Sequence, residues 1–497
     1  MKKSLYYLTI SLLISFYSVA QNREIPIDTI VVTNHSTTIK GKNISYQAQT
    51  GTQPVWGEKD NAIATLFYTY YRRTDIKKGI VRPLIFSFNG GPGAGSLWMH
   101  MGYTGPRILK VDSEGYPIQP YGFKSNPNSI LDEADIVFVN PVNVGYSRII
   151  DSKGKKEDRE TFFGVNQDIK YLAEWISTFI SRKNRWDSPK YLIGESYGGV
   201  RVMGLAHELQ DKQWIYLNGV IMVSPADYQV YPGPVSSAID FPYYTAASWY
   251  HKKLPDELQK LDLEEILPKS EEFALNELLP ALSKGGFIDE SEKNYIAEKI
   301  SFFTGLNKKD VIQNNINLST SFFWKELLRD EGKTIGRLDS RYKGIDKQDS
   351  GNRVDYNAEM SAWDHAFTPA INHYLQNELK FTSDTKYNTW GRNQHSVRPW
   401  NRDNVRVRDN LRQAMAENPF LKVFIQSGFY DGATTYFSAK YTMWQVDPSG
   451  KMKDRFFFKG YRSGHMMYLR QEDLVKANED LRKFIENTNT NGKPAKY

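Results

Sequence analysis

Residues 191–201 read YLIGESYGGVR, an apolar run followed by a serine between glycines. The apolar run is typical of a buried strand, and the residues that follow, GGVRVMGLAHELQ, are typical of a helix. Glycines at Gly194 and Gly198 permit a sharp turn between the two, because a Cβ at either position would collide with the neighbouring strand or helix. The stretch therefore predicts a strand–turn–helix that holds Ser196 out at a sheet edge, as a nucleophile requires.

A nucleophilic serine needs a base and a carboxylate that orients the base, in the chain order Ser, Asp, His for this kind of turn. The apolar run 421–428 leads into a loop that contains Asp431, and the run 455–460 leads into a turn that contains His465. Ligands of open α/β sheets bind beyond the carboxyl ends of the strands. We therefore predict that Ser196, Asp431 and His465 meet there as a catalytic triad.

A glycine-rich loop, NGGPGAG at residues 89–95, directly follows an early apolar run at 83–88. Adjacent glycines let a backbone approach a substrate closely and point its amides at a developing oxyanion. We assign the two oxyanion-hole donors to the backbone N–H of Gly91 and to that of Tyr197, the residue after the nucleophile.

The order of patterns along the chain indicates an α/β protein. Alternating runs before residue 80 favour antiparallel strands, whereas compact apolar runs later in the chain suit a parallel sheet covered on both faces. Helical patterns separate several of these runs. We predict an α/β-hydrolase fold, with a mixed, mostly parallel sheet flanked by helices. The compact runs lie at 83–88, 135–140, 190–195, 219–224 and 421–428.

The alternation stops between residues 231 and 390, where helical segments follow one another without a strong strand. An insertion of this length between two core strands predicts a helical cap over the working edge of the sheet. The predicted organisation is a signal peptide at 1–20, the first part of the core at 21–230, the cap at 231–390 and the second part of the core at 391–497.

The first residues, MKKSLYYLTISLLISFYSVAQ, have two lysines, an apolar run and small residues at Ser18 and Ala20, the layout of a cleavable secretory signal. We expect cleavage after Ala20 and export to the periplasm or the medium, with no stable membrane span in the remaining chain. The chain contains no cysteine, so its core is held by packing without disulfides.

Charge and motif content exclude other classes of function. The net charge of +7 comes from basic residues interspersed with acidic ones, which argues against a nucleic-acid partner. The histidines show no H-E-x-x-H spacing, so we predict no metal and no other cofactor. The sequence gives no oligomeric state.

Taken together, NGGPG, GESYGG, the aspartate of SGFYDGATT and the GHM turn resemble the serine carboxypeptidase family, secreted α/β-hydrolases that remove C-terminal residues from peptides. NPVNVGYS at 140–147 is similar to the family loop D-x-P-x-G-x-G-[FY]-S, with Asn140 in place of aspartate. GRLDSRYKG at 336–344 and GHMMYL at 464–469 are similar to bacterial members. The resemblance covers most of the chain after the predicted signal, and it implies substrates that are peptides with a free C-terminus.

By the same resemblance, Asn89 and Glu195 match the residues that hold the terminal carboxylate of the substrate. Two carboxylates repel each other, so Glu195 can bind this group only when it is protonated, and activity on peptide acids should favour acidic pH. Eukaryotic members carry a second glutamate where this chain has Tyr103. A tyrosine hydroxyl can still donate a hydrogen bond, and we therefore include Tyr103 in the predicted carboxylate site.

Two other functions fit parts of the pattern. An esterase or acyltransferase on the same scaffold would use the same triad. A peptide-binding protein without catalysis belongs to a different class, and the presence of all three triad residues argues against it. Labelling by a fluorophosphonate requires an activated serine and separates an enzyme from a binding protein.

Overall fold

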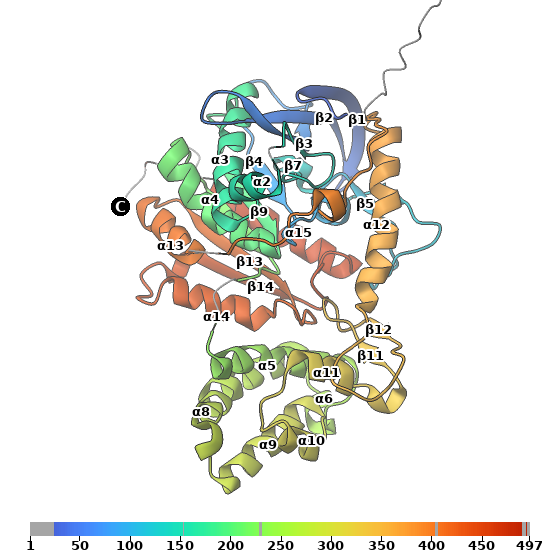
Figure 1. Cartoon of the computed structure of the whole chain (residues 1–497), viewed down its shortest axis with the longest axis vertical. Coiled ribbons are helices and arrows are strands. Elements are labelled where there is room, and N and C mark those ends of the chain that lie inside the picture. Colours follow the sequence, from blue (N-terminus) through green and yellow to red (C-terminus); the bar gives the residue numbers. More distant parts are fainter. Residues whose placement is uncertain (1–23, 153, 228–230, 403–405, 490–493, 495–497) are drawn as a thin grey trace, which may run out of the picture.

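The computed structural model describes residues 24–152, 154–227, 231–402, 406–489 and 494. The predicted signal peptide at 1–20 lies outside the described residues. Within the described residues, ten strands form one sheet, in the order β1-β2-β3-β7-β4-β9-β10-β13-β14, with β8 paired to β3 (Figure 1). The strands are β1 (Thr29–Ile39), β2 (Lys42–Trp56), β3 (Ala62–Arg73), β4 (Leu84–Phe88), β7 (Asp135–Val139), β8 (Arg148–Ile149), β9 (Lys190–Glu195), β10 (Gly219–Val223), β13 (Lys422–Gly428) and β14 (Phe456–Tyr461).

The sheet has an antiparallel and a parallel part, as the sequence predicts. Strands β1, β2 and β3 pair antiparallel, and β3 pairs antiparallel with β7. From β7 onward every neighbouring pair is parallel. The carboxyl ends of β4, β9, β10, β13 and β14 therefore meet along one edge, where ligands of such sheets bind.

Helices cover both faces of the central parallel strands, which is why β4, β7, β9 and β10 are buried along their whole length. Successive residues of β9 point to opposite faces, so that Leu192 packs in one core cluster and Ile193 in the other. The cluster around Leu192 is covered by α3 (Val165–Arg182), α4 (Tyr197–Gln213), α13 (Val407–Glu417) and α14 (Tyr436–Val446). The cluster around Ile193 is covered by α1 (Leu97–Gly102), α12 (Ala358–Asn377) and α15 (Gln471–Thr488).

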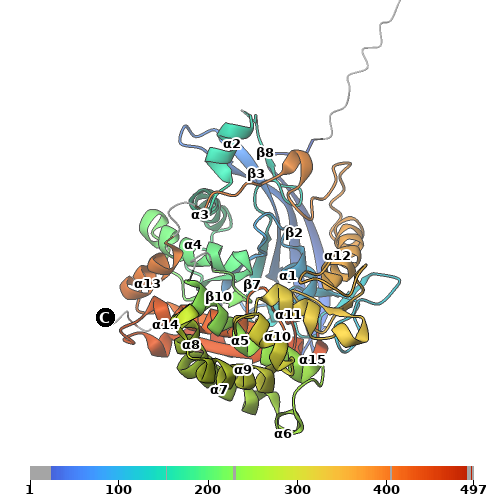
Figure 2. The same ribbon diagram turned by 60° about the horizontal axis from the view of Figure 1, so that its bottom comes forward.

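A separate group of helices lies below the sheet in Figure 1 and comes forward in Figure 2. These helices share their own apolar cluster, which runs from Phe241 to Ile335. They are α5 (Gly233–Tyr250), α6 (Asp256–Gln259), α7 (Leu263–Phe273), α8 (Leu279–Lys284), α9 (Glu290–Thr304), α10 (Lys308–Gln313) and α11 (Thr320–Glu326). The hairpin of β11 (Thr334–Ile335) and β12 (Lys343–Gly344) follows them.

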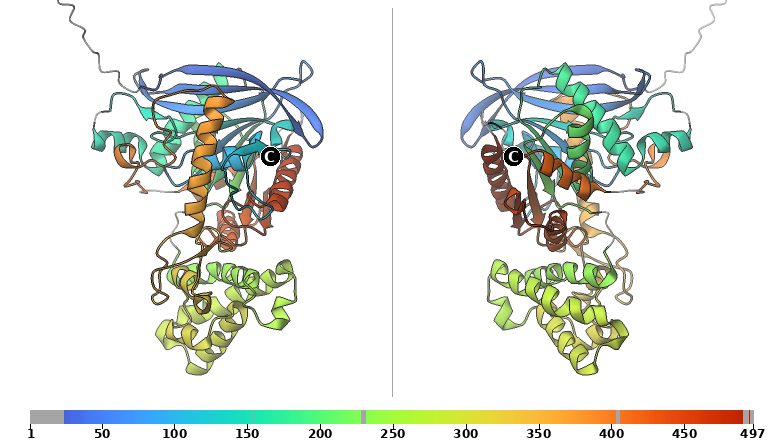
Figure 3. Two further views of the ribbon diagram at one scale, coloured as in Figure 1. Left: turned by 90° about the vertical axis from the view of Figure 1, so that its right-hand side faces the viewer. Right: turned by 90° about the vertical axis from the view of Figure 1, so that its left-hand side faces the viewer.

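Helix α12 runs alongside the sheet rather than with the helical group (Figure 3). Its residues Trp363 and Phe367 are buried in the cluster around Ile193. The sequence analysis placed this helix inside the predicted cap at 231–390. The apolar face of a helix does not reveal which element it packs against, so its position on the sheet could not be predicted. The boundary of the cap at residue 390 stays a prediction.

The remaining elements are short connections. They are α2 (Lys155–Phe162), the hairpin β5 (Arg107–Leu109) and β6 (Phe123–Ser125), the π-helix η2 (Ala274–Leu278), and the 3₁₀ turns η1 (Ile130–Asp132), η3 (Gly285–Phe287), η4 (Arg329–Glu331), η5 (Asn393–His395) and η6 (Lys453–Arg455). Among the helices that the structure describes, none is long and apolar enough to cross a membrane.

Candidate active site

Ser196 occupies the turn between β9 and α4, in a backbone conformation that non-glycine residues rarely adopt, with φ 59° and ψ −123°. Its N–H donates to the Val223 carbonyl at 2.9 Å, and its own carbonyl accepts from the Gly199 N–H at 2.8 Å. A Cβ at Gly194 would lie 2.1 Å from the Gly198 oxygen, so this close approach needs glycine. Among residues 191–206, Ser196 alone is partly exposed, and its side chain is therefore the one offered to solvent.

Asp431 and His465 are paired beyond the ends of β13 and β14. Asp431 is fully buried, and its Oδ2 lies 2.6 Å from His465 Nδ1. The other oxygen, Oδ1, accepts from the backbone N–H of Ala433 at 2.9 Å and of Thr434 at 3.2 Å. The Thr434 hydroxyl lies 2.6 Å from Oδ2. The carboxylate is thus fixed on both oxygens, as a group that orients an imidazole must be.

The charge state of His465 follows from its neighbours. Burial lowers the pKa of this imidazole, but the charge of Asp431 and the hydrogen bond to it raise the pKa, and Glu195 raises it further. The net result is a pKa above the ordinary 6.5. Asp431 thus favours the protonated imidazole, the form that His465 would take on accepting a proton from a hydroxyl group.

One short segment at the end of β10 joins the three parts of the site. Val223 accepts the N–H of Ser196, while the Ser224 hydroxyl donates to the His465 carbonyl at 2.9 Å. The Ser224 carbonyl in turn accepts from the Thr434 hydroxyl at 2.9 Å. The structure therefore brings Ser196, Asp431 and His465 to the same edge of the sheet.

The glycine-rich loop after β4 lies against the Ser196 turn. A Cβ at Gly90 would lie 2.5 Å from the Tyr197 nitrogen and 2.8 Å from Ser196 Cβ, so only glycine permits this approach. Gly91 has φ +107° and is exposed, which leaves its backbone next to the open side of the site. Both predicted oxyanion donors, at Gly91 and Tyr197, belong to these two adjoining segments.

Asn89 and Glu195 form a buried pair at the base of the site. The Asn89 amide donates to Glu195 Oε2, and the Asn89 Oδ1 accepts from the Met99 N–H at 3.0 Å. The second oxygen of Glu195 accepts from the hydroxyl of Tyr468 at 2.7 Å. Each oxygen of this carboxyl group therefore has a hydrogen-bond donor from a neutral side chain.

The position of Tyr103 corrects the prediction that its hydroxyl contacts the carboxylate of the substrate. The ring of Tyr103 is buried behind that of Tyr468, with centroids 5.1 Å apart and planes inclined by 7°. Its hydroxyl donates to Gln426 Oε1 at 2.7 Å, away from Glu195. The tyrosine whose hydroxyl donates to Glu195 is Tyr468. The only signal in the sequence was the position of Tyr468, three residues after His465.

Glu195 is a weak acid in these surroundings. Burial raises the pKa of Glu195 above its ordinary 4.5, although His465, the Tyr468 hydroxyl and the Asn89 amide each lower it, and Asp431 raises it. The net shift is upward. This carboxyl group thus keeps its proton to a higher pH than an exposed glutamate, and it can then donate a hydrogen bond to an anion.

A buried ion pair that the sequence analysis did not identify contacts the backbone of Asn89. Arg201, on α4, donates from Nη1 to the Asn89 carbonyl at 2.6 Å and from Nε to Asp168 at 2.7 Å. Both charged side chains are fully buried. The signal in the sequence was an arginine five residues after Ser196 on a helix that is otherwise apolar in this turn.

None of the described residues forms a group of three or more histidines, aspartates and glutamates that could hold a metal ion. The Asp431–His465 pair and the Asn89–Glu195 pair lie at the same edge of the sheet as Ser196, an arrangement suited to acyl transfer by a serine.

The strand order, together with a serine turn after β9 and an Asp–His pair beyond β13 and β14, defines an α/β-hydrolase. A crystal structure of a prohormone-processing carboxypeptidase from Saccharomyces cerevisiae superposes with a TM-score of 0.55 at 13% sequence identity, covering 89% of this chain and 91% of that chain. At this identity the likeness establishes the fold.

The family follows from the sequence comparison. The family model of serine carboxypeptidases matches residues 42–470, and the chain therefore belongs to the serine carboxypeptidase family. Serine carboxypeptidase-like 36 from Arabidopsis thaliana is 32% identical over 171 residues, which are 33% of each chain. Putative serine carboxypeptidase-like 30 from the same plant is 26% identical over 231 residues, covering 44% of this chain and 42% of the relative. The matched regions thus span between a third and a half of these curated relatives.

Proposed function

We propose that this protein is a serine carboxypeptidase that hydrolyses the last peptide bond of substrates with a free C-terminus. The observation that carries the proposal is the Asn89–Glu195 pair, which lies directly beside Ser196 in the sheet edge. In our proposal, a peptide whose terminal carboxylate is held there presents its last peptide-bond carbonyl to the Ser196 hydroxyl. Family membership and the Asp431–His465 pair support the same conclusion.

The chemistry follows the general course of acyl transfer. His465 accepts the proton of the Ser196 hydroxyl as the serine oxygen attacks the last peptide carbonyl, while Asp431 holds the imidazole through Nδ1. His465 then protonates the departing amino group, and the C-terminal amino acid leaves. Water, deprotonated by His465, attacks the acyl-enzyme and regenerates Ser196.

The tetrahedral intermediate carries a negative oxygen that needs donors already in place. The backbone N–H groups of Gly91 and Tyr197 serve as these donors in our proposal. Loss of one such donor typically costs about 2.7–4 kcal/mol of transition-state stabilisation. The contact between Gly90 and the Ser196 turn keeps the two donors at a fixed separation.

The terminal carboxylate is bound through a proton on Glu195. A neutral Glu195 donates to one carboxylate oxygen and the Asn89 amide to the other, whereas an ionised Glu195 would repel the substrate. Tyr468 holds Glu195 through its other oxygen. Peptide acids should thus be cleaved best at a pH where Glu195 is protonated and a sufficient fraction of His465 is neutral.

The biological setting is part of the proposal. The layout of residues 1–20 supports export through a signal peptide, and the similarity of GRLDSRYKG and GHMMYL to bacterial members supports a place in the bacterial branch. Natural substrates would then be peptides outside the cytoplasm.

The test is the release of free amino acids from N-blocked dipeptides between about pH 4 and 8, followed by mass spectrometry. The matching peptide amides and the variant Ser196→Ala are run in parallel. We expect release from the acids, little release from the amides, and no release by Ser196→Ala. Equal release from acids and amides would refute carboxylate recognition by Asn89 and Glu195.

A fluorophosphonate probe separates the alternatives. Labelling of Ser196 without peptide cleavage would refute the carboxypeptidase proposal in favour of an esterase or acyltransferase. Absence of both labelling and cleavage in a correctly folded protein would indicate a binding protein without catalysis.

A further inference from the structure

We propose that residues 336–342, which we call the bridge loop, position His465 and Asp431 for catalysis, and that Arg341 is the positioning residue that fixes this loop. The inference rests on the proposed function, because it assigns a role to residues outside the triad. The bridge loop connects β11 and β12, and its sequence GRLDSRY has no role in the proposed mechanism.

The bridge loop touches both loops of the Asp–His pair through the backbone. The Leu338 carbonyl accepts the N–H of His465 at 2.7 Å, and the Arg337 carbonyl accepts the N–H of Gly432 at 3.0 Å. The bridge loop thereby contacts His465 itself and the residue after Asp431. A shift of this loop would move the two members of the pair relative to each other.

A third backbone contact completes the attachment to the Asp431 loop. The Ser340 N–H donates to the Tyr430 carbonyl at 2.9 Å, and the Ser340 hydroxyl lies 3.1 Å from the same oxygen. Tyr430 directly precedes Asp431, so the bridge loop holds the chain on both sides of this aspartate.

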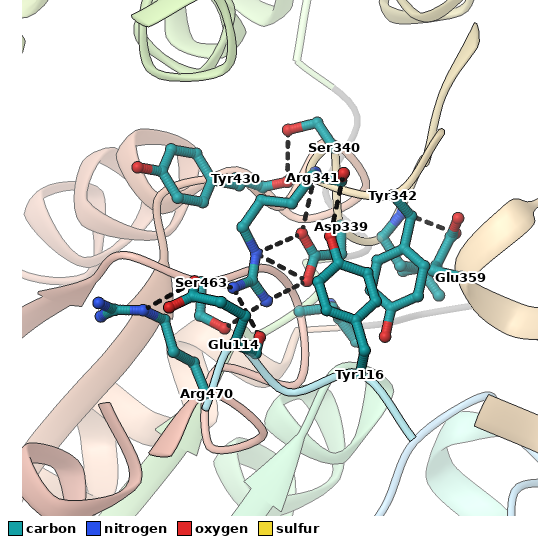
Figure 4. Close-up of polar contacts among 12 residues, drawn as sticks. Glu114, Tyr116, Asp339, Ser340, Arg341, Tyr342, Glu359, Tyr430, Ser463 and Arg470 are labelled. Atoms are coloured by element: carbon teal, nitrogen blue, oxygen red, sulfur yellow. Dashed lines mark hydrogen bonds and ion pairs between the residues drawn. The ribbon is translucent and has the colours of Figure 1, made fainter. Parts of the chain in front are cut away.

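The side chain of Arg341 joins the bridge loop to Ser463, in the turn that leads to His465 (Figure 4). Its guanidinium binds Asp339 from Nε at 2.9 Å and from Nη2 at 2.6 Å. The same Nη2 lies 3.1 Å from the Ser463 hydroxyl, and Nη1 donates to the Glu114 carbonyl at 3.0 Å. Ser463 lies two residues before His465, and Arg341 therefore joins the loop, the His465 turn and the core segment at Glu114.

Asp339 and Arg341 are both buried. The side chains of Asp339 and Arg341 are 2% and 1% exposed, respectively. A Cβ at Gly464 would lie 2.4 Å from Asp339 Cβ, so Asp339 packs directly against the residue before His465. Because closely packed groups cannot move independently, a displacement of the bridge loop would also displace the His465 imidazole.

The bridge loop also links the helical group to the catalytic edge. On its far side, the Leu338 N–H donates to Glu359 Oε1 at 2.9 Å, and His251 Nε2 lies 2.6 Å from the Ser340 carbonyl. Glu359 belongs to α12, while His251 directly follows α5. The N–H of Leu338 is thus bound by α12, and its carbonyl is bound by His465.

The guanidinium of Arg341 contacts the Asp339 carboxylate, the Ser463 hydroxyl and the Glu114 carbonyl, so in our proposal Arg341 acts through the position of His465 and not on the substrate. Catalysis is sensitive to such positioning, because a misplacement of about 1 Å can cost about 100-fold in rate. The predicted signature is a fall in kcat with little change in KM, since the carboxylate-binding pair Asn89 and Glu195 is untouched.

The experiment compares Arg341→Met, Arg341→Lys and the double variant Asp339→Asn/Arg341→Met. The double variant removes the uncompensated carboxylate that the single methionine variant leaves in the interior, so it separates folding from positioning. Arg341→Lys keeps the charge next to Asp339 but loses the forked contacts to Ser463 and Glu114. Kinetics on an N-blocked dipeptide, the rate of fluorophosphonate labelling of Ser196 and the melting temperature are measured for each.

Arg329→Met is the matched control. Arg329 lies in the same insertion and also binds a nearby carboxylate, Glu326, at 2.7 Å and a backbone carbonyl, that of Gly351, at 2.8 Å. It contacts neither catalytic loop among the described residues. This control should keep kcat within twofold of the wild type.

We expect the double variant and Arg341→Lys to lose about 10- to 100-fold in kcat, with KM within about threefold, and to label with the probe more slowly by a similar factor. Recovery of kcat together with the melting temperature in the double variant would overturn the proposal, since Arg341 would then act only on stability. An equal loss in Arg329→Met would also overturn it.

The labelling rate keeps this test independent of the proposed function. If the wild type labels but cleaves no peptide, the carboxypeptidase proposal fails, whereas slower labelling of the Arg341 variants still supports the positioning role. If the wild type cleaves peptides and all variants label at its rate, the positioning proposal fails alone.

Discussion

Replacing Tyr468 by phenylalanine should extend the activity on peptide acids to higher pH. In the structure the Tyr468 hydroxyl donates to Glu195 Oε1 at 2.7 Å. This hydrogen bond favours the ionised carboxylate and thereby lowers the pKa of Glu195, against the larger effect of burial, which raises it. Without the hydroxyl the charged form loses one of its two donors, and the pKa of Glu195 rises further.

The size of the effect follows from the strength of one hydrogen bond. A hydrogen bond to a charged group contributes about 1.5–3 kcal/mol, and about 1.4 kcal/mol corresponds to one pH unit. If substrate binding requires the protonated form of Glu195, as we propose, activity is present below its pKa and is lost as the pH rises through it. The alkaline limb of kcat/KM should therefore move upward by about 1–2 pH units in Tyr468→Phe.

The assay is kcat/KM for an N-blocked dipeptide acid from about pH 4 to 9, with the corresponding methyl ester as a second substrate. The ester has no terminal carboxylate, so its rate should follow the neutral fraction of His465 and show no limb from Glu195. Tyr103→Phe is the matched control, because that hydroxyl donates to Gln426 rather than to Glu195.

Two results would refute this reasoning. One is an alkaline limb in Tyr468→Phe that stays in place or moves to lower pH. The other is an equal upward shift in Tyr103→Phe. Loss of a hydroxyl that does not contact Glu195 would then change the pKa of Glu195 as much as loss of the Tyr468 hydroxyl, and the hydrogen bond from Tyr468 would not be the cause.

Three further predictions concern the support of the site. Gly90→Ala places a methyl group 2.5 Å from the Tyr197 nitrogen, and we expect a fall in kcat of about 10²–10³, the cost of one oxyanion donor, in steady-state assays. Arg201→Met leaves Asp168 as a buried unpaired charge, and chemical denaturation should show a loss of about 3–5 kcal/mol in unfolding free energy. Burial raises the pKa of Glu359 to about 7, so its protonated form stabilises the fold below pH 4.5 and this contribution is lost as the pH rises through about 7. Glu359→Gln should remove this loss, which amounts to about 3 kcal/mol, when unfolding is compared at pH 5 and pH 8.

Each of these predictions has a contrary outcome. An unchanged kcat in Gly90→Ala would show that the loop at residues 89–95 can accommodate the added methyl group without displacing the proposed oxyanion donors. Recovery of wild-type stability in Asp168→Asn/Arg201→Met is expected if the unpaired charge causes the loss, and continued instability would contradict that cause. A parallel pH dependence of unfolding in Glu359→Gln and the wild type would exclude Glu359 as the titrating group.

Local patterns in the sequence were sufficient for the sheet and for the order of the site. The glycines around Ser196, the apolar run before it and the positions of Asp431 and His465 after apolar runs are all properties of short segments. A parallel strand that is buried on both faces is apolar along its whole length, so its end can be located without knowing its neighbours. The serine turn, the Asp–His pair and the glycine-rich loop could therefore be placed at one edge in advance.

The surroundings of Glu195 required the tertiary structure. Tyr103 and Tyr468 lie far apart in the sequence, and only their stacked arrangement in the structure shows which hydroxyl reaches Glu195. The Arg201–Asp168 ion pair could not be identified from the sequence for a similar reason. Burial of either charge alone is unfavourable, and the partner that compensates it lies on another helix.

The sequence by itself determined the fold class, the serine turn and the positions of Asp431 and His465 beyond the ends of two strands, because glycine conformations and strand burial are set by near neighbours along the chain. Only the tertiary structure decided that α12 packs on the sheet, that Tyr468 holds Glu195, and that the bridge loop binds the His465 turn. These contacts join segments that lie far apart in the sequence. Their partners are selected by packing in three dimensions, which no local pattern records.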